Sequence, residues 1–109
     1  MENVLIVVIV NKGFTDLVME AALDSGARGG TVLGARGTGN SQIEEFYGVQ
    51  IKPDKEIVLI VVKNNIKDKV LEAIGKAAGL NTKGQGIAFA LPVSDTIGME
   101  GENEEPVKK

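Results

Sequence analysis

The stretch Val4-Leu5-Ile6-Val7-Val8-Ile9-Val10 decides the fold of this chain, because all of its residues are apolar and most of them are β-branched. Branched side chains favour the extended backbone, and Asn11-Lys12-Gly13 follows as a turn. We therefore predict a strand over residues 4–10. A strand with one solvent-exposed face alternates apolar and polar residues. This uninterrupted apolar run therefore indicates that both faces of the strand are covered.

Three further segments have strand character. Residues 57–62 and residues 87–91 are continuous apolar runs, and a shorter run at residues 31–35 follows two glycines. We expect Pro92 to help end the last of these strands, because proline cannot donate a hydrogen bond to a neighbouring strand. The sequence therefore predicts four strands.

Two segments between the strands have apolar residues at helical spacing. In the first, residues 15–25, we expect Thr15 to cap the helix and Ser25-Gly26 to end it. The second covers residues 66–78 and has Asn64-Asn65 as candidate caps. The chain thus repeats a strand, a helix and a strand.

This order predicts an α+β fold of the ferredoxin-like βαββαβ type, with a four-stranded antiparallel sheet and two helices on one face. We expect one domain over residues 1–97 and a disordered acidic tail over residues 98–109. Two helices cover only one sheet face, so the apolar second face predicts an obligate homo-oligomer.

Composition excludes several functions. The chain of 109 residues has no histidine and no cysteine, which argues against zinc sites, thiol nucleophiles and histidine bases, and we predict that it is not an enzyme. A net charge of −3 argues against nucleic acid as a partner. We expect a cytoplasmic protein with no obligatory cofactor, and the apolar run at the start is too short to span a bilayer.

Two glycine-rich stretches are the candidate ligand surface. Residues 34–39 read Gly-Ala-Arg-Gly-Thr-Gly, and residues 79–86 read Gly-Leu-Asn-Thr-Lys-Gly-Gln-Gly. Glycine allows the backbone to approach a bound group and to direct N–H groups at phosphate oxygens. Plain turns are the alternative interpretation, because neither stretch is a dinucleotide fingerprint or a P-loop.

The chain resembles the PII family of nitrogen-regulatory signalling proteins in three segments. The first runs from Gly26-Ala27-Arg28-Gly29-Gly30-Thr31-Val32 to Arg36-Gly37-Thr38-Gly39, and the second begins at Lys55-Glu56-Ile57 and continues to Val62 with the helix behind it. The third and most specific is Gly84-Gln85-Gly86-Ile87-Ala88-Phe89-Ala90-Leu91-Pro92-Val93.

This resemblance implies a ferredoxin-like homotrimer that binds adenine nucleotides in clefts between subunits. It also implies a mobile T-loop at about residues 40–54, which contacts a target enzyme or membrane transporter, and a B-loop at about residues 79–86. The nucleotide would lie between the two glycine-rich stretches. By position, the resemblance implies a ligand site made of Thr31, Arg36, Gly37, Thr38, Gly39, Asn40, Ser41, Lys55, Val61, Lys83, Gly84, Gln85, Gly86 and Ile87.

The chain lacks three positively charged residues of the family pattern. Ile87 stands where the pattern has a lysine, and Gly98 and Glu100 stand where it has two arginines. We therefore expect a divergent PII-like protein whose binding of ATP, ADP or AMP is weak or altered, with Arg28, Arg36, Lys55 and Lys83 as substitute cations.

The same trimeric scaffold leaves other functions open. One is a protein-interaction module that takes no small ligand, in which the glycines serve only tight turns. Another is a metal-tolerance protein, for which the chain lacks the soft ligands histidine and cysteine.

Overall fold

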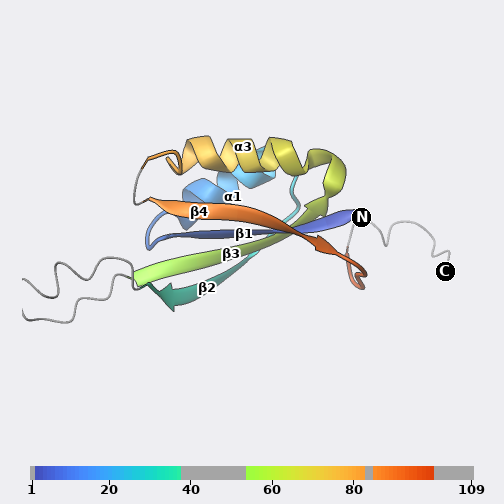
Figure 1. Ribbon diagram of the computed structural model, residues 1–109, viewed down its shortest axis with the longest axis horizontal. Helices are drawn as coiled ribbons and strands as arrows, with labels where there is room; N and C mark the ends of the chain where they lie inside the picture. Colours follow the sequence, from blue (N-terminus) through green and yellow to red (C-terminus); the bar gives the residue numbers. More distant parts are fainter. Residues whose placement is uncertain (1, 38–53, 83–84, 100–109) are drawn as a thin grey trace, which may run out of the picture.

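The computed structural model describes residues 2–37, 54–82 and 85–99. Its elements are β1 (Asn3–Asn11), α1 (Thr15–Asp24), β2 (Thr31–Arg36), β3 (Asp54–Lys63), the 3-10 turn η1 (Asn64–Ile66), α3 (Lys67–Ala77) and β4 (Gly86–Val93). The strands form one antiparallel sheet in the order β2-β3-β1-β4, and both helices lie on the same face of it (Figure 1). The predicted ferredoxin-like α+β fold is confirmed.

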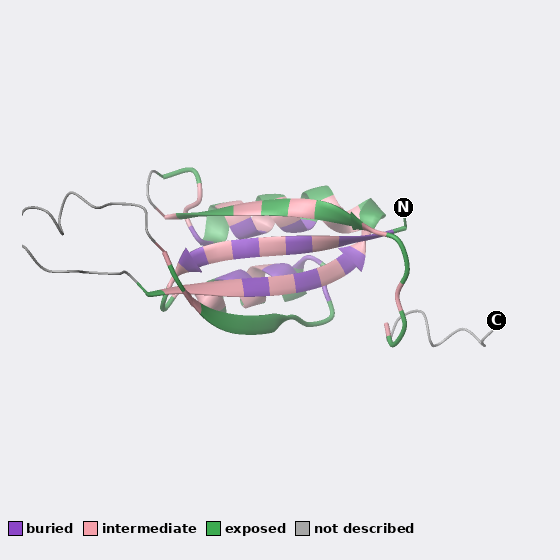
Figure 2. Cartoon of the chain, turned by 60° about the horizontal axis from the view of Figure 1, so that its bottom comes forward, coloured by how far each residue is buried: buried purple, intermediate pink, exposed green. Residues whose placement is uncertain are grey.

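The hydrophobic core lies between the sheet and the two helices. Buried and half-buried residues alternate along β1 and β3 (Figure 2), because successive side chains of a strand point to opposite faces. Full burial of one valine or isoleucine contributes about 1.5–3 kcal/mol. The fully buried side chains that form the centre of this core are Ile6, Val8, Val10, Val18, Val58, Ile60, Val70 and Ile74.

The opposite face of the sheet is also apolar, and no described helix lies over it (Figure 1). The register places Val7 between Leu59 and Phe89, and the rows on either side are apolar as well. Phe89 is 38% exposed and Ile87 is 55% exposed. Within the described part of one chain, the helices therefore cover one face of the sheet, as expected (Figure 1). The other face keeps exposed apolar side chains.

The start of each helix differs from the prediction. Thr15 is the first helical residue, Phe14 occupies the capping position, and no side chain caps α1. Asn64 and Asn65 form the turn η1, so α3 begins at Lys67 and also lacks a side-chain cap. Packing of the apolar faces against the sheet stabilises both helices without caps.

The end of α1 follows the prediction. Gly26 has a φ of +113°, and its N–H donates to the Leu23 carbonyl at 3.1 Å. The N–H of Ala27 donates to the Ala22 carbonyl at 2.9 Å, which completes a Schellman motif. Glycine is favoured here because the left-handed backbone costs it little.

β4 continues through Pro92 to Val93, so the expectation that proline ends this strand was wrong. β4 is an edge strand of the sheet, and an edge strand tolerates a residue that has no N–H on its outer side. Of the predicted loop at residues 40–54, only Asp54 lies within the described residues, and it begins β3. Of the predicted tail at residues 98–109, the description covers Gly98 and Met99.

We predict that Ile74→Ala in α3 lowers the free energy of unfolding by about 2–5 kcal/mol, because Ile74 is fully buried and its truncation leaves a cavity. Leu23→Ala in α1 should cost less than about 1 kcal/mol, because Leu23 is 47% exposed. Urea denaturation at one fixed protein concentration measures both values. Equal losses in the two variants would contradict this assignment of the core.

Candidate functional site

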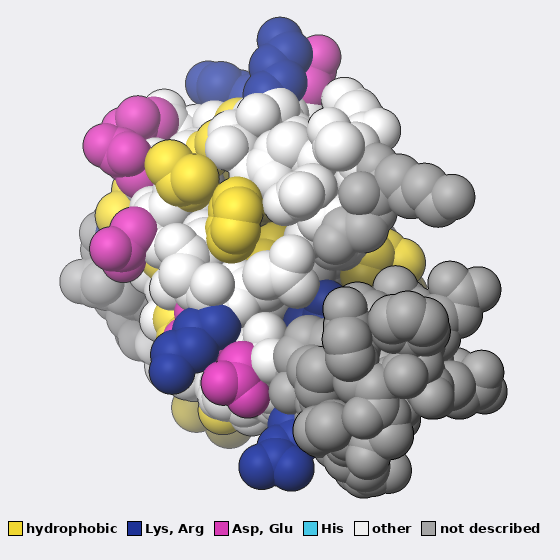
Figure 3. All heavy atoms as spheres, turned by 90° about the vertical axis from the view of Figure 1, so that its left-hand side faces the viewer, with side chains coloured by type: hydrophobic (Ala, Val, Ile, Leu, Met, Phe, Trp, Pro, Cys, Tyr) yellow, Lys and Arg dark blue, Asp and Glu magenta, His cyan; other side chains and the backbone are white. Residues whose placement is uncertain are grey.

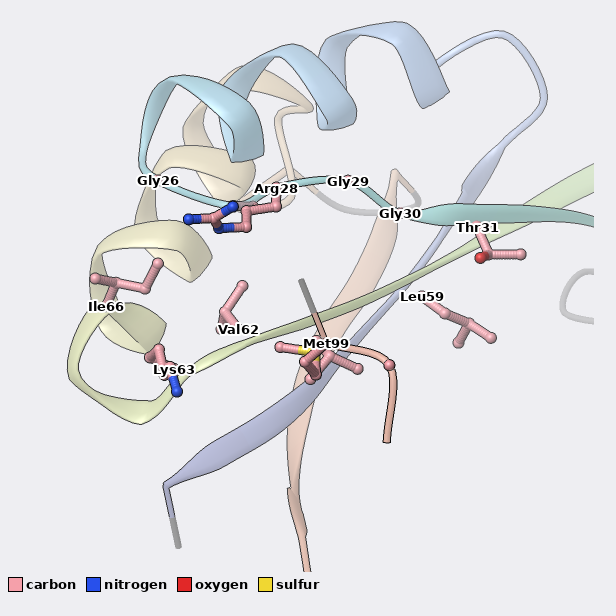
Figure 4. A pocket seen from close by; sticks show the side chains of 13 residues that line it. Gly26, Arg28, Gly29, Gly30, Thr31, Leu59, Val62, Lys63, Ile66 and Met99 are labelled. Atoms are coloured by element: carbon pink, nitrogen blue, oxygen red, sulfur yellow. The ribbon is translucent and has the colours of Figure 1, made fainter. Parts of the chain in front are cut away.

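The difference in length between β2 and β3 creates a notch at one end of the sheet. β2 pairs with residues 54–59 of β3, so residues 60–63 extend past the start of β2. The connection at residues 26–30 leaves the sheet there and runs to the end of α1. The notch holds a pocket of about 350 Å³ between this connection, β3 and η1 (Figure 4).

Two glycines allow the walls of this pocket to come together. A Cβ on Gly30 would lie 2.9 Å from Met19 Sδ, 3.0 Å from Ile60 Cγ1 and 3.2 Å from the Leu59 carbonyl oxygen, so a larger residue would displace its neighbours between α1 and β3. A Cβ on Gly26 would lie 3.2 Å from Ile66 Cδ1, which shows that the end of α1 packs on η1. Packing thus favours glycine at Gly30, and the φ of +113° favours it at Gly26.

Most of the pocket lining is apolar, and it includes Leu59, Val61 and Met99. Met99 reaches the pocket from the segment after β4, which turns at Gly98 with a φ of +93°. The polar side chains on the lining are Arg28, Thr31 and Lys63, and no aspartate or glutamate is among the described lining residues. This arrangement suits a ligand with an apolar body and an acidic group.

Thr31 and Val61 are the predicted site residues that line this pocket. Lys55, Arg36 and Gly37 lie at the other end of β2, where Arg36 pairs with Asp54. There the ammonium of Lys55 donates to Asn11 Oδ1 at 2.7 Å, and a Cβ on Gly37 would lie 2.8 Å from Lys55 Cε. The Lys55 side chain therefore packs between β2 and the end of β1.

Gln85, Gly86 and Ile87 lie at the start of β4. Gly86 has a φ of +144°, and a Cβ there would press on the Ile9 carbonyl oxygen and on Val10. Ile87 follows on the open face of the sheet, opposite Ile9. Six predicted site residues lie outside the described part of the chain: Thr38, Gly39, Asn40, Ser41, Lys83 and Gly84.

The two glycine-rich stretches lie at opposite edges of one sheet. The first begins within β2, the second ends at the first residue of β4, and two strands lie between β2 and β4. Three strand spacings of about 4.8 Å amount to about 14 Å. Among the described residues, Thr31 and Val61 lie at the opposite end of the sheet from Gly37 and Gly86.

Surface charge at the end where β2 finishes is mixed. Figure 3 shows lysine and arginine side chains interspersed with aspartate and glutamate among the residues that are described there. Within residues 2–37, 54–82 and 85–99, no group of acidic side chains is arranged to hold a metal ion. No described helix is long and apolar enough to cross a membrane.

Thr31 and Val61 are the lining residues that were predicted as site residues, and Arg28 was expected as a substitute cation. Leu59, Lys63, Ile66 and Met99 are among the lining residues that were not predicted. Leu59 lies in the predicted strand at residues 57–62, which was interpreted as core, and Lys63 directly follows that strand. Met99 lies in the segment that was predicted to be a disordered tail. The predicted runs at residues 31–35 and 57–62 differ in length by one residue, so run length did not indicate the notch.

A four-stranded antiparallel sheet with two helices on one face and a pocket at the start of β2 define a small α+β protein with a ferredoxin-like fold. The family model for Nitrogen regulatory protein P-II matches residues 3–103. The chain belongs to this family.

Two similar proteins agree with this membership. The chain is 35% identical over 99 residues to an Arabidopsis thaliana protein described as a nitrogen regulatory protein P-II homolog, and the match covers 84% of this chain. It covers 50% of that protein, so the chain spans about half the length of the curated relative. A crystal structure of Arabidopsis thaliana PII bound to citrate superposes with a TM-score of 0.71 at 30% identity, over 91% of this chain and 84% of the other.

We predict that Gly30→Ala destabilises the protein by about 1–3 kcal/mol, because the added methyl overpacks the contact with Met19 and Ile60. Gly29→Ala is the matched control, since a Cβ at Gly29 meets nothing within 4 Å, and its effect should stay within about 0.5 kcal/mol. Thermal and urea unfolding measure the stability of the two variants. An equal loss of unfolding free energy in both variants would contradict the packing assignment.

Proposed function

We propose that this chain is a PII-like regulatory protein that forms a homotrimer, binds an adenine nucleotide or a related small effector in clefts between subunits, and controls a partner through residues 40–54. The observation that carries the proposal is the pocket at the start of β2. Its walls include Thr31 and Val61, which the resemblance assigns, together with the backbone of residues 37–39, to the adenine and ribose side of a nucleotide.

The open face of the sheet supports the assembly. Its apolar side chains lie in rows across β3, β1 and β4, such as Leu59, Val7 and Phe89. A soluble protein rarely leaves a continuous apolar face of this extent in water. Copies of the same sheet supply a matching surface, and a closed ring of three would cover every copy equally.

The split between the two groups of predicted site residues supports a cleft between subunits. Within one chain, Thr31 and Val61 lie at the opposite end of the sheet from Lys55 and Gly86. An oligomer can place one end of a chain against the other end of its neighbour. A complete site would then take one group from each copy.

A small anion is the effector chemistry that fits best. The solved relative is described as bound to citrate, which is itself a small polyanion. The pocket carries Arg28 and Lys63, and Ile87 replaces the lysine of the family pattern. We therefore propose ATP, ADP or AMP as effectors and no obligatory cofactor, with a transporter or an enzyme of nitrogen regulation as the partner, in the cytoplasm and without catalysis by this chain.

Titration calorimetry with ATP, ADP and AMP tests the effector. We expect at least one of them to bind the purified protein with measurable heat and to raise its melting temperature, because a ligand that binds only the native state stabilises it. No heat with any of the three nucleotides would overturn the proposal in favour of an interaction module without a small ligand.

Size exclusion with light scattering tests the assembly. We expect a particle of about three times the 11.5 kDa chain mass, and we expect Phe89→Asp to dissociate it, because a carboxylate would be buried in the apolar interface. Leu17→Asp is the control, since Leu17 is 43% exposed on α1, away from the open face. A wild-type monomer, or dissociation of both variants alike, would contradict the trimer.

A further inference from the structure

We propose that the Lys55 side chain is a latch that couples the end of β2 to the turn before α1, so that the two chain ends open as one local unit. Gly37 and Asp54 lie at the two ends of the segment through which the proposed function contacts a partner. The regulatory meaning of the latch therefore rests on the proposed function, whereas the coupling itself is carried by contacts within one chain.

Lys55 lies on β3, between the two chain ends that it joins. The register places it opposite Ala35 of β2 on one side and opposite Asn11 of β1 on the other. Residues that lie opposite one another on neighbouring strands share one face of the sheet. Figure 1 shows the end of β2, the start of β3 and the turn after β1 together at one end of the sheet. One side chain at this position can therefore reach both neighbouring strands.

On the β1 side, the ammonium of Lys55 holds the last residue of the strand. It donates to Asn11 Oδ1 at 2.7 Å in a partly buried position, and a hydrogen bond with a charged donor is stronger than a neutral one. The Asn11 carbonyl in turn accepts from the N–H of Phe14 at 3.2 Å, and Phe14 occupies the capping position of α1. Lys55 therefore helps to fix the residue that holds the start of α1.

Two backbone N–H groups of the same turn bond to the neighbours of Lys55 on β3. The N–H of Lys12 donates to the Asp54 carbonyl at 3.2 Å, and the N–H of Gly13 donates to Glu56 Oε1 at 3.2 Å. Each bond alone makes a modest net contribution to stability. Because all three acceptors and donors on β3 belong to consecutive residues, we expect the three bonds of this turn to break together.

On the β2 side, the Lys55 side chain packs against the backbone of Gly37. A Cβ on Gly37 would lie 2.8 Å from Lys55 Cε and 3.2 Å from Lys55 Cγ. A methyl group at residue 37 would displace the Lys55 side chain, whose ammonium is bonded to Asn11. A change at the end of β2 is thus transmitted through Lys55 to the turn after β1.

The latch gives the two ends of the connection between β2 and β3 a common state. A local unit held by a few partly exposed hydrogen bonds opens at a lower free energy than the whole fold. When Lys55 leaves Asn11, the end of β2 and the turn before α1 lose the same contact. A molecule that favours one arrangement of Gly37 would therefore also bias the start of α1, because coupling between two places is reciprocal.

Amide hydrogen exchange of the intact protein, resolved by residue, tests the coupling. Gly37→Ala should accelerate exchange of the Lys12 and Gly13 amides by about fivefold, the scale of one lost hydrogen bond. Gly34→Ala is the matched control, because it adds the same methyl group to β2 where a Cβ meets nothing within 4 Å, and it should change both rates by less than about twofold. The Val8 amide, in the centre of β1, should keep its rate in both variants, because the latch opens locally.

Lys55→Met removes the ammonium and should accelerate the Gly13 amide by a similar factor, although its own acceptor on Glu56 is unchanged. Lys55→Arg should retain most of the protection. An unchanged Gly13 rate in Lys55→Met, or equal acceleration by Gly37→Ala and Gly34→Ala, would overturn the coupling. Equal acceleration of Val8 would assign the effect to global destabilisation and overturn it as well. Because these rates are measured without a nucleotide, a failure of nucleotide binding overturns the proposed function alone and leaves the coupling standing.

Discussion

The pairing of β1 with β3 on one side and β4 on the other is the interaction on which the rest of the structure depends. Val8 lies opposite Val58 and Ala88, and this register continues along the strand. A shift of one residue would move every buried side chain of β1 to the open face. Both faces of β1 are apolar, so the turns and the small Ala88 and Ala90 must help to define which face receives the helices.

The same register determines where a ligand can bind. β3 is longer than β2, so the last residues of β3 form the floor of the pocket. At the other end of β3, Lys55 donates a hydrogen bond to Asn11 at the end of β1. The two ends of the sheet therefore have different chemistry. One end offers an apolar groove with Arg28 and Lys63, and the other presents Lys55 beside glycine backbone.

The sequence predicted most of the fold because strand signals in this chain are local. The apolar runs of β1 and β3 and the glycine at the end of α1 identify their own structure without reference to the rest of the chain. The continuation of β4 through Pro92 could not be predicted in this way, because it depends on the place of β4 at the sheet edge. The pocket was predicted only through Thr31 and Val61, since its walls come from residues 26–31, 59–66 and 98–99, which meet only in the folded chain.

Glycine content alone does not identify the ligand of this site. Gly30 fits between Met19 and Ile60, Gly86 lies against the Ile9 carbonyl, and Gly37 lies against Lys55. Packing within one chain is therefore sufficient to favour glycine at Gly30 and Gly86, with or without a phosphate, whereas the contact at Gly37 is with the flexible end of the Lys55 side chain. Discrimination between ligands must then come from side chains, and the cations on the pocket lining, Arg28 and Lys63, are the groups that can distinguish one anion from another.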